Sequence, residues 1–276
     1  MNPYKDKIAF VTGAASGIGY ALTEALLSKG AKVMMADVDG PGLEDAIAKL
    51  GGASDNLSST LCDVRDLEAV KAAADLTVET FGGVNIVMNN AGVGLAGRSG
   101  KTPIEDWRWI VDINLMGVVH GVEVFTPLIS KASGGFILNT ASMAGHMTTE
   151  YMPPYHATKF AVVGYTESIA QELAKKNITV TTLCPTWVKS NIAHSGDNRP
   201  SASILDAATS SALTMTQDLV SNGMEASCLA DLTLAMMAEG RLHVFNDPEA
   251  RPMIDIRAKS LAEDYDAALA WLETHS

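Results

Sequence analysis

Short apolar runs alternate with amphipathic helical stretches along most of this 276-residue chain. The apolar runs predict strands at residues 8–11, 32–37, 57–62, 85–88, 135–140, 178–184 and 242–245. The amphipathic stretches predict helices at residues 17–29, 42–50, 66–81, 103–112, 113–131, 154–176, 225–238 and 254–272. Such alternation favours a parallel sheet covered by helices on both faces. We therefore expect one α/β domain over residues 1–276, built on a doubly wound parallel sheet.

The composition argues against several kinds of partner. The net charge of −12 would repel both the phosphates of nucleic acids and anionic membranes. No apolar run approaches the ~18 residues that a membrane span needs, and charged residues rather than a signal peptide precede the first strand. The three cysteines, Cys62, Cys184 and Cys228, form no C-x-x-C pair and are typical of free thiols. We expect a cytoplasmic protein without a metal site.

A glycine-rich segment, Thr12 to Gly19, lies between the first predicted strand and the first predicted helix. Glycines at this place permit a tight turn and close approach of a pyrophosphate, which the N-terminus of the helix attracts. The candidate residues for this contact are Gly13, Ser16, Gly17, Ile18 and Gly19. Similar loops serve flavins or S-adenosylmethionine, and a glycine-rich turn can be simple punctuation.

Asp37 ends the second predicted strand, 18 residues after Gly19. An acidic side chain near that offset binds the ribose hydroxyls of NAD and would repel the 2′-phosphate of NADP, so we expect NAD as the cofactor. An exposed turn residue is the alternative interpretation. Polar or small residues that follow the second, third and fourth strands complete the candidate cofactor site: Val38, Asp63, Val64, Asn90, Ala91 and Gly92.

Tyr155 and Lys159 are four residues apart in a predicted helix and share one face of it. A nearby ammonium and an oxidised nicotinamide would both lower the pKa of the phenol, which could then exchange a proton near neutral pH. Ser142, after the fifth strand, could hold a substrate oxygen, and Asn114 could hold a water that links Lys159 to solvent. Taken singly, each of these residues could be a packing, capping or kink residue instead.

Together these motifs resemble the short-chain dehydrogenase/reductase family in its classical form, over residues 5 to 190. The resemblance rests on Thr12 to Gly19, Asp63, Asn89 to Gly92, Asn114, Ser142 and Tyr155-x-x-x-Lys159. It implies a seven-stranded Rossmann-type sheet, a catalytic tetrad of Asn114, Ser142, Tyr155 and Lys159, and a homotetramer or homodimer. It also implies that Lys159 holds the nicotinamide ribose and that Pro185 and Val188 contact the cofactor.

The sequence departs from the family pattern after the sixth strand, where Thr186 stands in place of the usual glycine. A threonine adopts positive φ only with strain, so the loop either does not need that conformation or is reshaped. By analogy with the family, residues 189–223 form a substrate lid. The candidate substrate residues suit a bulky, apolar or aromatic secondary alcohol or ketone, and they are Met143, His146, Met152, Trp187 and Ile192.

Three functions are compatible with the glycine loop. The four residues of the tetrad favour an NAD-dependent oxidoreductase that acts on a secondary alcohol or ketone. A non-catalytic NAD-binding or scaffold protein would need the loop but not the tetrad. A methyltransferase that uses S-adenosylmethionine would bind that cofactor in place of NADH.

Overall fold

The computed structural model describes residues 2–201 and 205–275, and within them seven strands form one sheet. The strands are β1 (Ile8–Thr12), β2 (Lys32–Asp37), β3 (Leu57–Leu61), β4 (Ile86–Asn89), β5 (Gly135–Thr140), β6 (Ile178–Cys184) and β7 (His243–Phe245). All neighbouring pairs are parallel, in the order β3-β2-β1-β4-β5-β6-β7. The predicted Rossmann-type sheet is confirmed, and each strand end lies within one residue of its predicted position.

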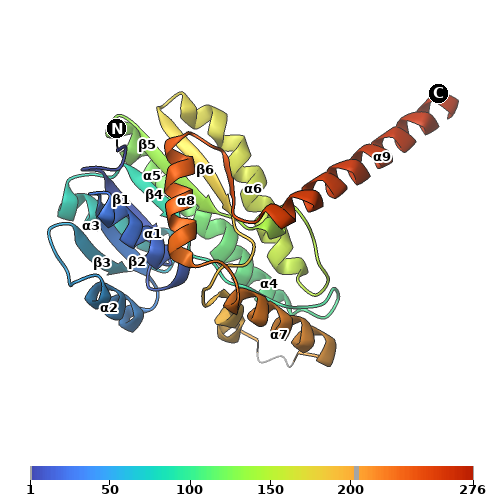
Figure 1. Cartoon of the computed structure of the whole chain (residues 1–276), viewed down its shortest axis with the longest axis horizontal. Coiled ribbons are helices and arrows are strands. Elements are labelled where there is room, and N and C mark those ends of the chain that lie inside the picture. The colour runs from blue at the N-terminus through green and yellow to red at the C-terminus, as the bar shows by residue number, and fades with distance from the viewer. Residues whose placement is uncertain (1, 202–204, 276) are drawn as a thin grey trace.

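Helices connect the strands and cover the sheet (Figure 1). The α-helices are α1 (Gly17–Ser28), α2 (Gly40–Lys49), α3 (Leu67–Phe81), α4 (Ile104–Val111), α5 (Gly117–Lys131), α6 (Pro153–Ala174), α7 (Ala207–Ser221), α8 (Ala226–Ala238) and α9 (Arg251–His275). Shorter helical turns are η1 (Asp112–Met116), η2 (Met143–Gly145), η3 (Ile192–Asn198) and η4 (Pro248–Ala250). Helix α2 begins two residues before its predicted start, because the Asp39 carboxylate caps it by accepting from the Gly42 N–H at 3.1 Å.

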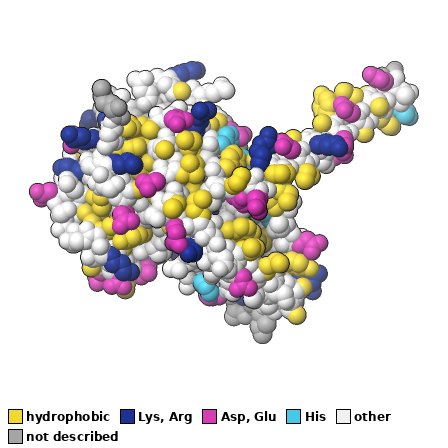
Figure 2. Space-filling view, in the orientation of Figure 1, with side chains coloured by type: hydrophobic (Ala, Val, Ile, Leu, Met, Phe, Trp, Pro, Cys, Tyr) yellow, Lys and Arg dark blue, Asp and Glu magenta, His cyan; other side chains and the backbone are white. Residues whose placement is uncertain are grey.

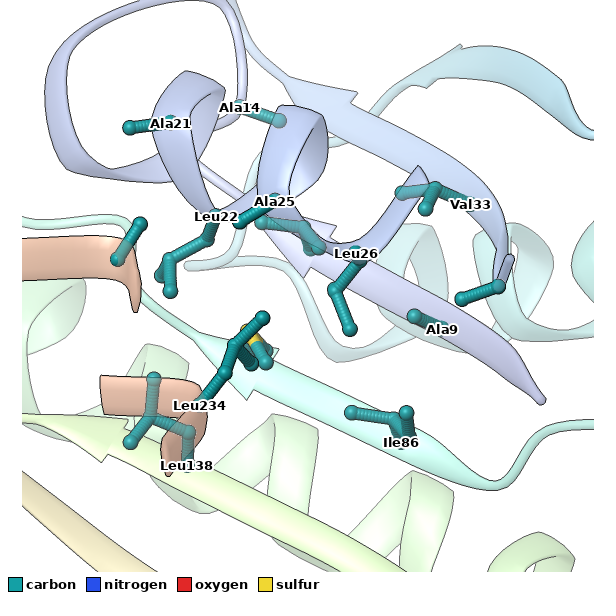
Figure 3. Packing of buried hydrophobic residues seen from close by; sticks show 14 of the residues in the cluster. Ala9, Ala14, Ala21, Leu22, Ala25, Leu26, Val33, Ile86, Leu138 and Leu234 are labelled. Carbon is teal, nitrogen blue, oxygen red and sulfur yellow. The ribbon is translucent and has the colours of Figure 1, made fainter. Parts of the chain in front are cut away.

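Both faces of the sheet are buried, which explains why the strands read as continuous apolar runs. On one face, Leu22 and Leu26 of α1 and Leu234 of α8 pack over Ile86 and Leu138 of the central strands (Figure 3). On the other face, α3 and α5 pack a second apolar cluster, in which Phe125 of α5 stacks on Phe10 of β1 with ring centroids 4.5 Å apart. Because helices cover both faces of the sheet, a ligand can bind only beyond the ends of its strands.

The run α4–η1–α5 is one continuous helix from Ile104 to Lys131. Its length and its mean hydropathy of 1.3 over the most apolar window are those of a membrane span. Val122, Phe125 and Ile129 of this run are nevertheless buried against the sheet, so it is a core helix of this fold. The prediction of two successive helices is corrected to one helix interrupted by the π-turn η1.

The strand order reverses between β1 and β4, because β2 and β3 extend the sheet on one side and β5 to β7 on the other. In sheets of this kind ligands bind beyond the carboxyl ends of the strands at such a reversal. The chain segments that leave β1, β2, β4, β5 and β6 all lie at that edge. The fold therefore brings the predicted site residues to one side of the molecule.

Candidate active site

A cavity of about 900 Å³ lies along the carboxyl edge of the sheet. It extends from Asp37, after β2, past the glycine loop after β1, to Ser142 and Tyr155 beyond β5. Segment 190–200 and Val220 of α7 form its other wall. The cavity wall thus combines an acidic residue, a glycine loop and a phenol, the groups expected around a dinucleotide and a small molecule beside it.

The glycine loop is tightly packed against the end of β4. Gly13 has φ +64°, and a Cβ there would lie 2.9 Å from the Cα of Ala91. The Thr12 hydroxyl accepts from the N–H groups of Asn90 (2.9 Å) and Ala91 (3.0 Å), and the Asn90 amide donates to the Thr12 carbonyl at 3.1 Å. These bonds fix the loop at the N-terminus of α1, where unpaired N–H groups attract phosphate.

Gly19→Ala is expected to destabilise the protein and weaken dinucleotide binding. A Cβ at this position would lie 2.1 Å from the Gly13 carbonyl oxygen and 2.7 Å from the Asn90 amide, so the loop itself must shift. Overpacking of this kind costs roughly 1–3 kcal/mol. Urea unfolding and NADH fluorescence titration measure the two effects. The matched control is Gly164→Ala, where nothing lies within 4 Å; equal behaviour of the two variants would contradict the tight-loop account.

Asp37 lies at the far end of the cavity from Tyr155. Its carboxylate accepts from the Ala15 N–H at 3.0 Å and from the Asp39 N–H at 3.1 Å, which fixes it beside the glycine loop. Asp63, after β3, is held instead by Arg65, whose Nη2 lies 2.6 Å from the carboxylate, and this ion pair lowers the pKa of Asp63. Among the described residues that line the cavity there is one arginine, Arg65, and one lysine, Lys159. Arg65 already forms an ion pair with Asp63.

Tyr155, Ser142 and Lys159 meet at the other end of the cavity. The Ser142 hydroxyl donates to the Pro185 carbonyl at 3.2 Å and lines the cavity together with the Tyr155 phenol. Lys159 is 3% exposed; its Nζ donates to the Thr140 carbonyl at 2.9 Å and lies 5.6 Å from the centre of the Tyr155 ring. A phenol, a hydroxyl and an ammonium thus share one wall.

Burial controls the titration of this group of residues. It raises the pKa of Tyr155, and the interaction with Ser142 opposes that shift only in part. It lowers the pKa of Lys159 to about 8. The expected lowering of the Tyr155 pKa is therefore not a property of the protein alone, because desolvation of the phenolate outweighs the interaction with Ser142.

Asn114 is fully buried in η1, the π-turn between α4 and α5. Its amide accepts from the Val93 N–H at 2.8 Å and donates to the Val93 carbonyl at 2.9 Å. The amide also donates to the Thr158 hydroxyl, which lies one residue before Lys159. Asn114 therefore joins the segment after β4 to α6, and a π-turn leaves part of the helical backbone ladder open at the same place.

The structure places nearly all predicted cofactor residues in the cavity wall. Gly19 lies just behind the loop, and the remaining fifteen line the cavity: Gly13, Ser16, Gly17, Ile18, Asp37, Val38, Asp63, Val64, Asn90, Ala91, Gly92, Tyr155, Lys159, Pro185 and Val188. Thr186 also lines it, and its φ is not positive. Its N–H donates to the Asn246 side chain at 2.8 Å, so this loop does not need the glycine conformation.

The predicted substrate residues are divided by the structure. Ile192 lines the cavity, whereas Met143, His146, Met152 and Trp187 do not. The turn η2 directs Met143 into the core (3% exposed) and leaves the His146 Nε2 3.3 Å from the Cys184 thiol, beside the ring of Phe245. Residues distant in sequence form the wall instead: Val93, Trp109, Ile113, His194, Pro200 and Val220.

The structure adds two residues to the predicted site: Thr12, which the motif included without a role of its own, and Trp109, which the sequence did not single out. Thr12 directly precedes Gly13, and a hydroxyl at the end of a strand next to a glycine loop is a readable signal. Trp109 lies in α4 and lines the cavity, and no local sequence pattern indicates that its side chain faces the site. No group of three or more His, Cys, Asp or Glu suited to a metal occurs in residues 2–201 and 205–275.

Comparison with known proteins agrees with this geometry. Residues 7–200 match the sequence model of the short chain dehydrogenase family. The chain is 33% identical to the CLA biosynthesis dehydrogenase/reductase of Lactiplantibacillus plantarum over 96% of both chains. It is 34% identical to the cyclohexanol dehydrogenase of an Acinetobacter species, over 68% of this chain and 75% of that one.

A solved short-chain dehydrogenase/reductase from Burkholderia phymatum, in complex with NAD, is also similar. Its TM-score is 0.92 and its identity 33%, with 96% of this chain and 97% of that chain covered. The chain therefore belongs to the short-chain dehydrogenase/reductase family, and it is an oxidoreductase.

Proposed function

We propose that this protein is an NAD-dependent oxidoreductase that interconverts a secondary alcohol and a ketone, with Tyr155 as the general acid and base. The observation that carries this proposal is the meeting of the Tyr155 phenol, the Ser142 hydroxyl and the Lys159 ammonium in one cavity with the glycine loop. Bound NAD supplies the acceptor for the hydride of the alcohol.

The residues fit NAD for three reasons. The close packing at Gly13 and Gly19, where a Cβ would meet Ala91 and the Gly13 carbonyl, holds the loop at the N-terminus of α1, whose N–H groups attract a pyrophosphate. Asp37, held by backbone N–H groups, presents a carboxylate suited to two ribose hydroxyls. The similar Burkholderia protein was solved with NAD. By the same reasoning Pro185 and Val188 face the nicotinamide end of the cavity.

Each of the four catalytic residues has a separate role in this proposal. Ser142 orients the substrate oxygen toward the phenol, and Tyr155 removes or returns the hydroxyl proton. Since burial raises the pKa of Tyr155, the phenolate needs positive charge nearby, which Lys159 and the bound pyridinium provide. Lys159 also reaches the ribose side of the cavity. Asn114 positions Val93 and α6. We propose that its π-turn also holds a water that connects Lys159 to solvent.

The substrate is a bulky, largely apolar alcohol or ketone. Val93, Trp109, Ile113, Ile192 and Val220 give the substrate end apolar side chains. Segment 190–200 adds polar ones that could hydrogen-bond a substrate: Ser190, Asn191, His194, Ser195 and Asn198. The similarity to a cyclohexanol dehydrogenase is consistent with a cyclic secondary alcohol. Segment 189–223, of which 202–204 lie outside the described residues, would act as the lid over this end.

The test is the reduction of NAD, followed at 340 nm, with cyclic and aromatic secondary alcohols, and the reverse reaction with their ketones. Turnover with at least one member of the panel is expected. Calorimetry with NADH and S-adenosylmethionine distinguishes the alternatives. Binding of S-adenosylmethionine alone would indicate a methyltransferase, and NADH binding without any turnover would support a non-catalytic NAD-binding or scaffold protein.

Asp37→Ala is expected to reduce the preference for NADH over NADPH at least about 10-fold, because a like-charge clash with the 2′-phosphate is worth more than 1 kcal/mol. The dissociation constants of both cofactors, measured by fluorescence, give this ratio. Asp45→Ala, an exposed acidic residue on α2, is the matched control. An unchanged ratio in Asp37→Ala would show that this carboxylate does not face the ribose.

We also propose that the protein acts in the cytoplasm as a homodimer or homotetramer, on a small molecule rather than on a nucleic acid or membrane. The acidic net charge of −12 supports the second part of this proposal. One sheet spans the described chain, which supports a single domain over residues 1–276.

A further inference from the structure

Helix α9 leaves the body of the protein and extends away from it as a single helix (Figure 1). None of its side chains is buried, although it is 25 residues long. A helix of this length is roughly 37 Å long and, in water, gains little stability without packing of one face. The structure of the isolated chain therefore leaves a long helix without the contacts that normally stabilise one.

The exposed surface of α9 is rich in large apolar side chains (Figure 2). Seven of them are 44–68% exposed: Met253, Ile256, Leu261, Tyr265, Leu269, Trp271 and Leu272. A stripe of apolar residues recurs along the helix at alternating steps of four and three residues: Ile254, Ala258, Leu261, Tyr265, Ala268 and Leu272. This spacing is the seam of a helix that pairs with another helix.

The charges of α9 are divided between its two halves. The half next to the body, residues 251–260, carries Arg251, Arg257 and Lys259 against Asp255 alone. The outer half, residues 261–275, carries acidic residues without a lysine or arginine: Glu263, Asp264, Asp266 and Glu273. Within the helix Arg251 pairs with Asp255 and Lys259 pairs with Glu263, whereas Asp264, Asp266 and Glu273 have no ion-pair partner among the described residues. Glu273 lies in the last turn, where a negative charge is unfavourable for a helix by itself.

We propose that α9 is an oligomerisation arm, which pairs antiparallel with α9 of a second copy of this chain. In an antiparallel pair the basic inner half of each helix lies beside the acidic outer half of the other. Such a contact is self-complementary, as a two-fold symmetric interface between identical chains must be. The apolar stripe fills the seam, and the charges fix the orientation.

In an antiparallel pair, the position of α9 lets the tip of each helix contact the body of the other copy. At the base of the arm, Arg257 lies over the ring of Phe160 on α6, 5.0 Å from its centre, which fixes the direction in which the helix leaves. Two large apolar side chains near this base are exposed: Phe245, at the end of the edge strand β7, is 37% exposed, and Met253 is 44% exposed. The apolar tip of each arm, with Trp271 and Leu272, covers this base region on the other copy. The proposal is independent of the reaction that the protein catalyses.

Reversing the charges of α9 tests whether two copies of this helix contact each other and whether they pair antiparallel. The inner variant Arg251→Glu/Lys259→Glu makes both halves acidic, and the outer variant Glu263→Lys/Asp264→Lys/Asp266→Lys makes both halves basic. Each variant alone is expected to have half the mass of the wild type in sedimentation velocity at micromolar concentration. An equimolar mixture of the two is expected to regain the full mass, because the acidic arm of one complements the basic arm of the other.

The control, Glu44→Lys/Asp45→Lys/Glu79→Lys, makes the same charge change as the outer variant on exposed positions of α2 and α3, and should keep the wild-type mass. A monomeric wild type, or variants with unchanged mass, would overturn the proposal. So would variants of halved mass whose mixture does not reassociate, since the arm would then contact the second copy in another way. A far-UV circular dichroism spectrum confirms that each variant remains folded.

Discussion

Replacing Tyr155 with phenylalanine is expected to lower kcat for alcohol oxidation by about 10²–10⁴-fold, the usual contribution of a positioned general base. The ring still fills its place beside the substrate wall, so NADH binding should change little. The loss should fall on kcat rather than on the affinity for the cofactor, because the removed oxygen acts on the substrate proton. Steady-state kinetics and an NADH titration on the same preparation measure both quantities.

The control for this experiment lies on the same helix. Tyr165 is also on α6, and its buried hydroxyl has no hydrogen-bond partner among the described residues. Tyr165→Phe should therefore leave kcat unchanged and the protein at least as stable. Equal turnover of wild type and Tyr155→Phe would remove Tyr155 from the mechanism, whereas equal losses in both tyrosine variants would indicate a structural effect on α6.

Lys159→Met is expected to abolish most activity while changing how stability depends on pH. Burial lowers the pKa of Lys159 from 10.5 to about 8. Between these values the unfolded chain binds more protons than the folded one, so the free energy of unfolding rises with pH through this window. The shift corresponds to about 3 kcal/mol, which the charged lysine costs the wild type below pH 8 and which is absent in the methionine variant.

The measurable quantity is the difference in unfolding free energy between Lys159→Met and wild type, from urea titrations at one protein concentration. This difference should fall by about 3 kcal/mol between pH 7 and pH 10.5. Its absolute value is reduced by the loss of the bond from Lys159 to the Thr140 carbonyl. Lys175→Met, an exposed lysine after the same helix, should show no such pH dependence. A flat difference for Lys159→Met would mean that this lysine is not desolvated.

The sheet and the cofactor loop were predictable because their signals are local. Alternating apolar runs define β1 to β7 directly, and a glycine-rich loop between a strand and a helix indicates a nucleotide-type cofactor when polar residues follow the neighbouring strands. Asp37 and Asn90 follow predicted strands, and parallel strands bring their carboxyl ends to one edge. Positions of this kind need no knowledge of the tertiary structure.

The rest of the site depends on contacts between distant segments. Trp109 and Val220 reach the cavity from α4 and α7, which no periodicity connects. Met143 and His146 follow Ser142 closely, yet the turn η2 directs them away from the cavity. The raised pKa of Tyr155 and the lowered pKa of Lys159 likewise follow from burial, which motif spacing does not reveal.

Transfer of deuterium tests the central claim most directly. Secondary alcohols deuterated at the carbinol carbon, cyclohexanol among them, are incubated with NAD and the protein, and the reduced cofactor is examined by mass spectrometry. The account predicts NADH that carries the label, together with the matching ketone, and no such product with Tyr155→Phe on the same timescale. Unlabelled NADH, or no reduction with any alcohol of the panel and no oxidation of NADH by the ketones, would contradict it.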